Sequence, residues 1–302
     1  MTRMTLQGFV KLFRPLFLLG GILLYALGAG IARFLGNNID WQAYLLGQAC
    51  ATLLQLAPIF LKEYFDSFST PPRPFRRPEN QSEEKVPYTV GRLPALLISA
   101  TILTVGAVLT VLLYRNGNMK LEAFTIVGIA FLISFFYATP PVRLIYSGYG
   151  ELATAIMMAN LIPAFAFLLQ AGGFHRLLAM ATFPLTPIYL AMTLALSLPT
   201  YATDIKYENR TLLVRMGWQR AMSLHNVLIL SGFLLIALAM VLGLSWHVIW
   251  PVFLALPVGL FQIWQMIQIK EGAKPRFRLL TVTAIATFGL VAYLFAFTFW
   301  TG

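Results

Sequence analysis

Nine long apolar runs constrain this chain more than any other feature of its sequence. Each run is about 20 residues long, the length of an α-helix that crosses the hydrocarbon core of a bilayer. The runs are continuously apolar instead of alternating, which favours helices over the strands of a membrane barrel. The sequence therefore predicts an all-α, polytopic membrane bundle of nine transmembrane helices that takes up residues 1–302 as one domain. The expected spans are 15–34, 43–61, 93–114, 121–138, 151–171, 177–199, 222–243, 247–268 and 279–300.

Composition excludes a soluble protein. Hydrophobic residues make up 59% of the chain and charged residues 11%, whereas a soluble domain carries about 25% charged residues. The single cysteine, Cys50, leaves no partner for an intramolecular disulfide.

The basic residues lie almost entirely on one side of the predicted membrane. Of the 22 Lys and Arg residues, 18 fall in the N-terminal segment and the even-numbered loops, and four fall on the other side (Arg33, Arg115, Lys120 and Arg176). By the positive-inside rule the first side, with the N-terminus, is cytoplasmic. We expect a multi-pass protein of the cell (inner) membrane with a cytoplasmic active face. The net charge of +11 then sets topology and attracts anionic lipid headgroups, and nucleic-acid binding is not expected.

Two connections, residues 62–92 and 200–221, are much longer than the others. Long polar connections in a compact bundle tend to carry function. Each begins with two acidic residues three or four positions apart, so each pair is expected to share a helix face. The acidic residues are Glu63 and Asp66 in the first loop and Asp204 and Glu208 in the second, and the neighbouring cations are Lys62, Lys206 and Arg210.

These residue types together predict a site for a polyprenyl diphosphate at the membrane surface. Paired carboxylates can bind Mg²⁺, which prefers oxygen ligands and often bridges to substrate phosphates. Lys and Arg can bind the same phosphate oxygens, and the apolar bundle would hold the lipid tail. Ordinary ion pairs between helix residues are the alternative interpretation.

A third segment, from Tyr137 to Glu151, connects the fourth and fifth spans. It reads Tyr-Ala-Thr-Pro-Pro-Val-Arg-Leu-Ile-Tyr-Ser-Gly-Tyr-Gly-Glu, a Pro- and Gly-rich turn with one cation, Arg143. This segment resembles the corresponding loop of the UbiA superfamily of intramembrane prenyltransferases. It is most similar to the branch that prenylates dihydroxynaphthoate in menaquinone synthesis, which has a tyrosine, a proline-containing turn and Tyr-x-Gly-x-Gly-Glu before the fifth helix.

Other segments carry the same resemblance. Arg14-Pro15 opens the first span as in that family, and residues 209–217 resemble the basic-Thr-Leu-x-Val-x-x-Gly run after the family's second aspartate motif. Nine helices with the N-terminus inside are the family's architecture. The resemblance covers essentially the whole chain and implies a single UbiA-like prenyltransferase domain over residues 1–302.

The first metal motif departs from the family's pattern. That pattern is N-x-x-x-D-x-x-x-D, and the three positions here hold Lys62, Asp66 and Thr70. The second motif, D-x-x-x-D, is present as Asp204 and Glu208. A missing carboxylate and an added cation both weaken Mg²⁺ binding at the first loop. We therefore hypothesise that one metal plus Lys62 holds the diphosphate in place of two metals.

The resemblance implies Mg²⁺-dependent transfer of a prenyl group from a polyprenyl diphosphate to an aromatic acceptor, in quinone biosynthesis of the menaquinone type. Asp66 and Asp204 would be the central catalytic residues. The implied metal ligands are Glu63, Asp66, Asp204 and Glu208; the diphosphate ligands are Lys62, Arg143, Lys206 and Arg210; and the acceptor pocket contains Tyr137 and Tyr146.

Two other functions compete with this interpretation. The altered first motif also fits a catalytically impaired relative that binds isoprenoid lipid without turnover. A transporter is less favoured, because transporters place charged residues within their spans and often contain internal repeats. The spans of this chain are nearly free of charge, and no repeat relates its two halves.

Overall fold

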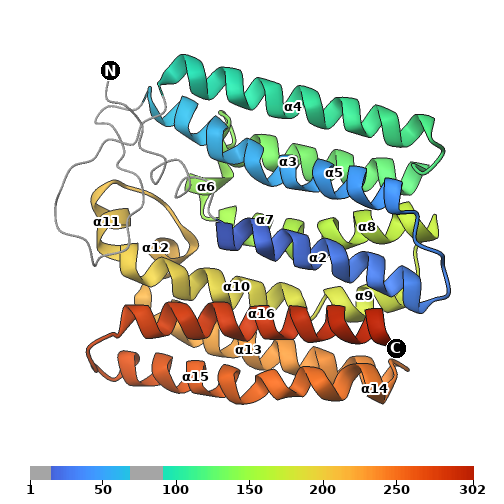
Figure 1. Cartoon of the computed structure of the whole chain (residues 1–302). Coiled ribbons are helices and arrows are strands. Elements are labelled where there is room, and N and C mark those ends of the chain that lie inside the picture. The colour runs from blue at the N-terminus through green and yellow to red at the C-terminus, as the bar shows by residue number, and fades with distance from the viewer. Residues whose placement is uncertain (1–14, 69–90) are drawn as a thin grey trace.

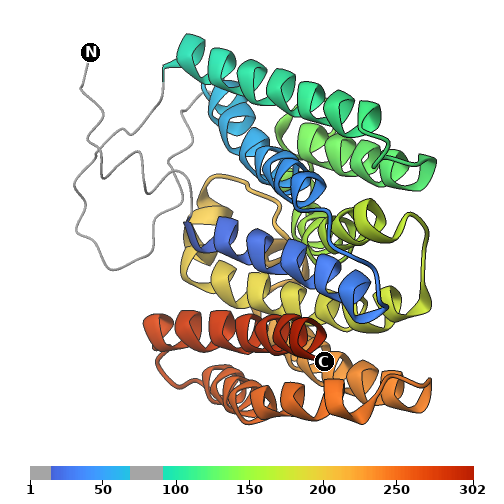
Figure 2. The same cartoon turned by 45° about the vertical axis from the view of Figure 1, so that its right-hand side comes forward.

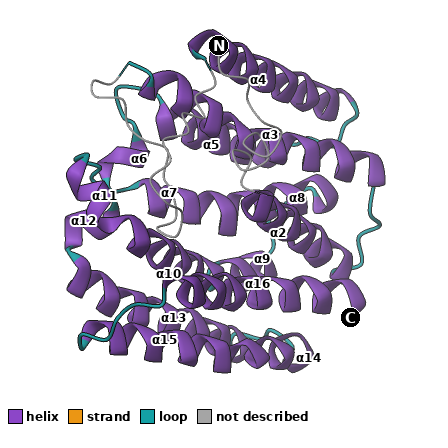
Figure 3. Cartoon of the chain, turned by 60° about the vertical axis from the view of Figure 1, so that its left-hand side comes forward, coloured by secondary structure: helices purple, strands orange, loops and turns teal. Residues whose placement is uncertain are grey.

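The computed structural model describes residues 15–68 and 91–302, and every regular element in these ranges is a helix (Figure 1). The described ranges contain nine helical segments that are long and apolar enough to cross a membrane. Figure 3 shows these helices packed side by side in one bundle. The predicted all-α, nine-span architecture is therefore confirmed.

The helices follow one another along the chain as successive antiparallel crossings. The first half contains α2 (Pro15–Phe34), α3 (Trp41–Asp66), α4 (Arg92–Arg115), α5 (Leu121–Ala138), α6 (Leu144–Ser147), α7 (Gly150–Ile156), the π-helical η1 (Met157–Leu161) and α8 (Ile162–Ala171). The second half contains α9 (Arg176–Thr182), α10 (Leu185–Ser197), η2 (Leu198–Thr200), α11 (Tyr201–Lys206), α12 (Leu212–Met216), α13 (Trp218–Val241), α14 (Trp246–Ile249), η3 (Trp250–Ala255), α15 (Leu256–Lys270) and α16 (Phe277–Thr301).

Two spans extend further than the sequence predicts, toward the same end of the bundle. Helix α3 continues to Asp66 instead of ending near residue 61, and the sixth span continues through α11 to Lys206 instead of ending near residue 199. The extra turns carry polar side chains, which hydrophobicity alone assigns to a loop. As a result, Lys62 and Asp204 lie on helices instead of loops.

The fifth span forms the centre of the bundle. In the segment Gly150–Ala171, 72% of the apolar stretch is buried inside the protein, whereas in α4 only 17% is buried. Figures 1 and 2 show α4 at one edge of the bundle and α15 at the other, with α7 and α8 between them. The helices next to the fifth span are therefore the ones that can enclose a site.

Close packing of α2 against α8 depends on Gly28. A Cβ atom added at Gly28 would overlap the backbone carbonyl of Pro163, at the second position of α8. Pro163 follows the wide turn of η1, where the Asn160 side chain donates a hydrogen bond to Thr186 of α10 (2.6 Å). Since π-helical turns shift the register of a helix, η1 and Gly28 together set how α2 and α10 lie against the fifth span.

Asp40 ties together the face of the bundle at which α3 begins. Its carboxylate caps α3 by accepting from the backbone N–H groups of Gln42 and Ala43, and it also accepts from the Asn118 side chain before α5. These hydrogen bonds, that of Ala43 first, hold the pKa of Asp40 below its ordinary value. Arg33, one of the basic residues predicted for the outer side, lies at the end of α2 on the same face.

The Gly28 contact gives a direct test of this packing. Gly28→Ala should lower the free energy of unfolding by about 1–3 kcal/mol, because the added methyl group overpacks a backbone contact. Gly20→Ala is the matched control, since nothing lies within 4 Å of a Cβ added there on the same helix. Thermal unfolding in detergent checks both, and equal stability of the two variants would contradict the described packing.

Candidate functional site

One end of the bundle brings together the segments that the sequence singles out. Figures 1 and 3 show α6, α11 and α12 at that end, where α3 also finishes. The N-terminal segment and residues 69–90 lie outside the described residues, so the structure does not place Arg14 or Thr70.

Asp66 is the centre of a charged cluster at the end of α3. Its side chain accepts hydrogen bonds from Lys62 Nζ (2.7 Å), Arg143 Nη2 (2.9 Å) and Tyr146 Oη (2.5 Å). Lys62 and Tyr146 contact one carboxylate oxygen and Arg143 contacts the other. The side chains of Lys62 and Arg143 are only 21% and 24% exposed, so water screens these ion pairs less than it screens surface pairs.

Arg143 reaches Asp66 from a backbone conformation that few residues adopt. The turn after α5 places Arg143 at φ 42° and ψ 61°, in the left-handed region. Its Nε atom donates to the carbonyl of Ala138 (3.3 Å), and its guanidinium lies 5.3 Å from the ring centroid of Tyr146. Such a conformation costs about 1–3 kcal/mol and persists where the surroundings hold it, often at functional sites.

Asp204 is the buried residue of the second motif. It is 2% exposed, and its carboxylate oxygens accept from Thr200 Oγ1 (3.0 Å) and Asn209 Nδ2 (3.2 Å). The Asn209 backbone N–H also donates to the Asp204 carbonyl (2.8 Å). Asp204 is thus fixed by residues on both sides of it in the chain.

The expectation that Asp204 and Glu208 share a helix face is wrong. Helix α11 ends at Lys206, and Glu208 follows at φ 53°. The N–H groups of Glu208 and Asn209 donate to the carbonyls of Ile205 and Asp204, which is the Schellman pattern with Glu208 where glycine is usual. This turn buries Asp204 and leaves Glu208 exposed.

The remaining predicted residues lie around these two centres. Glu63 is half-buried beside Lys62 on α3, and Tyr137 is half-buried on the last turn of α5. Lys206 and Arg210 are exposed, and Lys206 Nζ lies 5.8 Å from the ring centroid of Tyr207. The structure therefore joins Lys62, Asp66, Arg143 and Tyr146 by direct contacts. No such contact links them to the side chains of Lys206, Glu208 and Arg210 within the described ranges.

Two residues that were not predicted as site residues, Glu151 and Arg215, link the segment after α5 to α12. The Glu151 carboxylate accepts from the N–H of Leu212 (3.3 and 3.4 Å), the first residue of α12. Arg215 donates to the carbonyl of Ser147 (3.0 Å) and lies 4.9 Å from the ring centroid of Tyr149. Glu151 and Arg215 lie in the two family-like segments, 137–151 and 209–217. That resemblance was the sequence signal that could have identified them. The segment after α5 therefore contacts α3 on one side and α12 on the other.

Gly148 makes the second of these contacts possible. It has φ 81°, and a Cβ atom added there would overlap the side chain of Arg215. The first glycine of the Tyr-x-Gly-x-Gly-Glu run is thus required both by its backbone conformation and by the close approach of Arg215.

The end of α3 offers cations to an anionic ligand. Lys62, Arg143 and Tyr146 engage both oxygens of Asp66, and Glu63 is a second, half-buried carboxylate beside Lys62. Nowhere in the described ranges do three or more His, Cys, Asp or Glu side chains group as metal ligands. Asp204 and Glu208 are oxygen donors of the kind that Mg²⁺ prefers, but Asp204 is buried with both carboxylate oxygens hydrogen-bonded and Glu208 is exposed.

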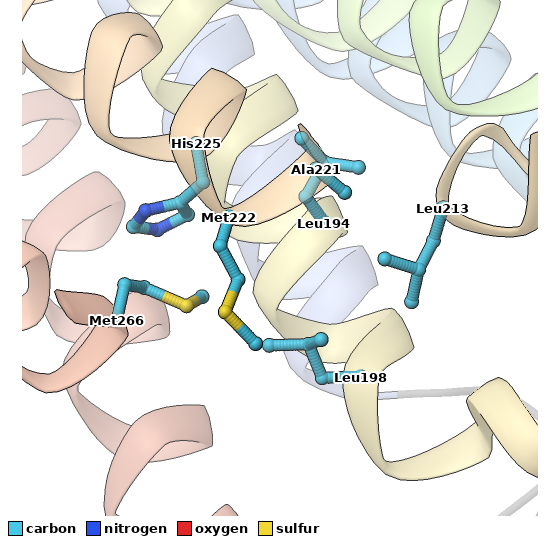
Figure 4. A pocket seen from close by; sticks show the side chains of 7 residues that line it. All are labelled: Leu194, Leu198, Leu213, Ala221, Met222, His225 and Met266. Atoms are coloured by element: carbon cyan, nitrogen blue, oxygen red, sulfur yellow. The ribbon is translucent and has the colours of Figure 1, made fainter. Parts of the chain in front are cut away.

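A small apolar pocket behind α12 is not part of this site. It comprises about 150 Å³ of space and has no room for a water molecule. Figure 4 shows its lining, which includes Met222, His225, Met266 and, opposite them, Leu213. His225 is fully buried and hydrogen-bonded to Gln262 (2.8 Å) and Asn226 (3.0 Å). We interpret the pocket as a packing gap in the bundle.

Comparisons with known proteins identify the fold. No protein-family model matches the chain, and no curated protein matches its sequence. Solved structures do match the chain along nearly its whole length, and they belong to one class of helical membrane proteins. The nine spans of the described ranges fit that class. The chain has the UbiA membrane fold.

Three of these structures illustrate the likeness. A UbiA homolog from Archaeoglobus fulgidus bound to GPP and Mg²⁺ has a TM-score of 0.61 and 16% identity, over 97% of this chain and 99% of that chain. The homolog from the same organism bound to DMAPP and Mg²⁺ has a TM-score of 0.60 and 17% identity, over 95% and 97%. A structure of digeranylgeranylglyceryl phosphate synthase has a TM-score of 0.64 and 15% identity, over 97% and 99%.

The left-handed conformation of Glu208 yields a prediction. Glu208→Gly should raise the free energy of unfolding by about 1 kcal/mol, because glycine adopts this conformation without the steric penalty of a side chain. Glu208→Gln keeps the strain and removes the charge, so its stability should equal that of the wild type. Thermal unfolding in detergent compares the three proteins. If the glycine variant is less stable than the wild type, the contacts of the Glu208 side chain stabilise the protein by more than its left-handed backbone conformation costs.

Proposed function

We propose that the protein is an intramembrane prenyltransferase that moves a prenyl group from a polyprenyl diphosphate to an aromatic acceptor. The observation that carries the proposal is the Asp66 cluster. It places two partly buried cations, Lys62 and Arg143, at the end of an apolar bundle, which suits a ligand with a diphosphate head and an isoprenoid tail. The ligands bound in the structural neighbours, GPP and DMAPP with Mg²⁺, support the same class of substrate.

In this proposal the residues divide the binding of the diphosphate between them. Lys62 and Arg143 bind its oxygens, and Asp66 and Tyr146 hold the two cations in position. Asp204, Glu208 and Glu63 are the candidate metal ligands, and Lys206 and Arg210 are the remaining cations of the site. When bound, Mg²⁺ would neutralise charge on the leaving diphosphate.

The chemical step follows from this arrangement. The bond between the allylic carbon and the diphosphate oxygen breaks, and its electron pair leaves with the diphosphate. The cations stabilise the charge that develops on the leaving group. A carbon of the aromatic ring forms the new bond and the ring then loses a proton, while the apolar interior keeps water from the carbocation. Tyr137 and Tyr146 would line the mouth of the acceptor pocket.

The finer assignments belong to the proposal as well. The resemblance of the Tyr137–Glu151 segment to the dihydroxynaphthoate branch supports an acceptor of the menaquinone pathway. The asymmetry of Lys and Arg supports a cell membrane location with the Asp66 cluster on the cytoplasmic face.

A relative without turnover is the second candidate, and one observation favours it. Both oxygens of Asp66 already face cations or a phenol, and Lys62 stands where the family has asparagine. Such a protein would bind prenyl diphosphate with the same residues and release nothing.

Pyrophosphate release separates the two candidates. Purified protein would receive geranyl diphosphate, a panel of aromatic acceptors and either Mg²⁺ or a chelator. We expect metal-dependent release that falls about 100-fold or more in Asp66→Ala and Asp204→Ala. Glu122→Ala, at the opposite face of the bundle, is the control and should keep wild-type activity. Absence of release from protein that still binds geranyl diphosphate would reject the transferase in favour of the non-catalytic relative.

A further inference from the structure

A groove lies between α4 and α5, at the face of the bundle where α3 begins. Both helices pack against α3 and only sparsely against each other, and the groove between them contains about 420 Å³ of space. Ligand sites in proteins commonly measure about 300–1,000 Å³. The groove is therefore large enough for a ligand, and it lies at the other end of α3 from the Asp66 cluster.

The lining of the groove is apolar and aromatic apart from two residues. One of these, Thr110, already donates its hydroxyl hydrogen to the carbonyl of Gly106 (2.9 Å), and the other is Lys120 at one end. Ordered water needs several polar partners, so such a lining does not hold it. The apolar and aromatic lining residues are Val111, Tyr114, Met119, Leu121 and Phe124.

The groove opens to the outside of the bundle. Figures 1 and 2 show α4 at the edge of the molecule, and Val111, Leu121 and Phe124 are each more than half exposed. In a membrane-spanning protein such side chains face hydrocarbon. An unfilled groove would deprive them of van der Waals contacts on one side, so a hydrocarbon chain is the natural occupant.

Two cations stand at the end of the groove. Arg115 is the last residue of α4, next to Tyr114, and Lys120 precedes α5, with its ammonium group beside Gly172 at the end of α8. Both cations are exposed, and neither side chain forms an ion pair or a hydrogen bond with another described residue.

The nearby carboxylates do not neutralise these cations. Glu122 is two positions from Lys120, and side chains at that spacing do not face each other on a helix. The carboxylate of Asp40 is engaged by the start of α3 and by Asn118. The apolar groove therefore ends at two positive charges that lack a partner among the described residues.

We propose that the α4–α5 groove binds an acyl chain of an anionic phospholipid, whose headgroup lies at Arg115 and Lys120. Such a lipid has a hydrocarbon chain for the groove and a negative charge for the two cations, which attract anionic headgroups at a bilayer surface. A zwitterionic lipid offers the same chain without the net charge. This inference does not depend on the proposed function, because it concerns the opposite end of α3.

The headgroup is tested by native mass spectrometry of the delipidated, full-length protein in detergent. The protein would be titrated with phosphatidylglycerol and with phosphatidylcholine that carry the same acyl chains. The wild type should bind one phosphatidylglycerol about fivefold or more tightly than phosphatidylcholine. Lys120→Gln should reduce this preference, and Lys120→Gln combined with Arg115→Gln should abolish it. Arg176→Gln is the matched control, since Arg176 is an exposed cation at the start of α9 and lies outside the groove lining.

The chain is tested by filling the groove. Val111→Trp should weaken the binding of both lipids about fivefold or more, because the indole takes up the space of the chain. Val108→Trp is the matched control on α4, since Val108 is also exposed (53%) and does not line the groove. Bound phosphatidylglycerol should also raise the Tm of the wild type and of both control variants, and it should raise the Tm of Val111→Trp much less. The Tm without lipid shows that each variant is folded.

Any of three results would overturn the inference. The first is equal affinity of the wild type for the two lipids. The second is a preference for phosphatidylglycerol that survives the double variant or falls equally in Arg176→Gln. The third is lipid binding by Val111→Trp that equals binding by Val108→Trp.

Discussion

The hydrocarbon core of a bilayer offers the backbone no hydrogen-bond partner, and the structure follows from that constraint. Each crossing in the described ranges is a helix, whose backbone hydrogen bonds are satisfied within the segment itself. Glycines such as Gly28 then decide how closely the helices approach. Against this apolar background the charged side chains at one end of the bundle stand out, because Asp66, Lys62 and Arg143 could have faced water and instead contact one another in a partly buried cluster.

The site is assembled by the segment after α5. Arg143 and Tyr146 contact Asp66 on α3, and Glu151 and Arg215 connect the same segment to α12. Within the described ranges, the two residues other than glycine with positive φ are Arg143 and Glu208, and both are candidate site residues. Unfavourable backbone conformations at these two positions indicate that the surrounding structure is organised to hold their side chains where they are.

Hydrophobic patterning predicts the nine spans because membrane length and apolarity leave little freedom. It places the ends of α3 and α11 too early, since Lys62 and Asp204 are polar and lie on turns that tertiary contacts keep helical. Residue spacing predicts that Asp66 has a cation nearby, and Lys62 fulfils this. Spacing alone cannot predict that Arg143, 77 residues away, reaches the same carboxylate. It also fails at Glu208, because a left-handed residue there ends the helix that the spacing assumes.

We hypothesise that Lys62 and Arg143 supply positive charge that a metal would otherwise supply at the end of α3. Equilibrium binding of geranyl diphosphate, measured with Mg²⁺ and with chelator in the wild type and in Lys62→Asn, tests it most directly. We expect the wild type to bind in chelator, Lys62→Asn to bind about tenfold or more weakly there, and Mg²⁺ to restore much of the difference. Binding by Lys62→Asn that equals or exceeds the wild type in chelator and at low Mg²⁺ would contradict it.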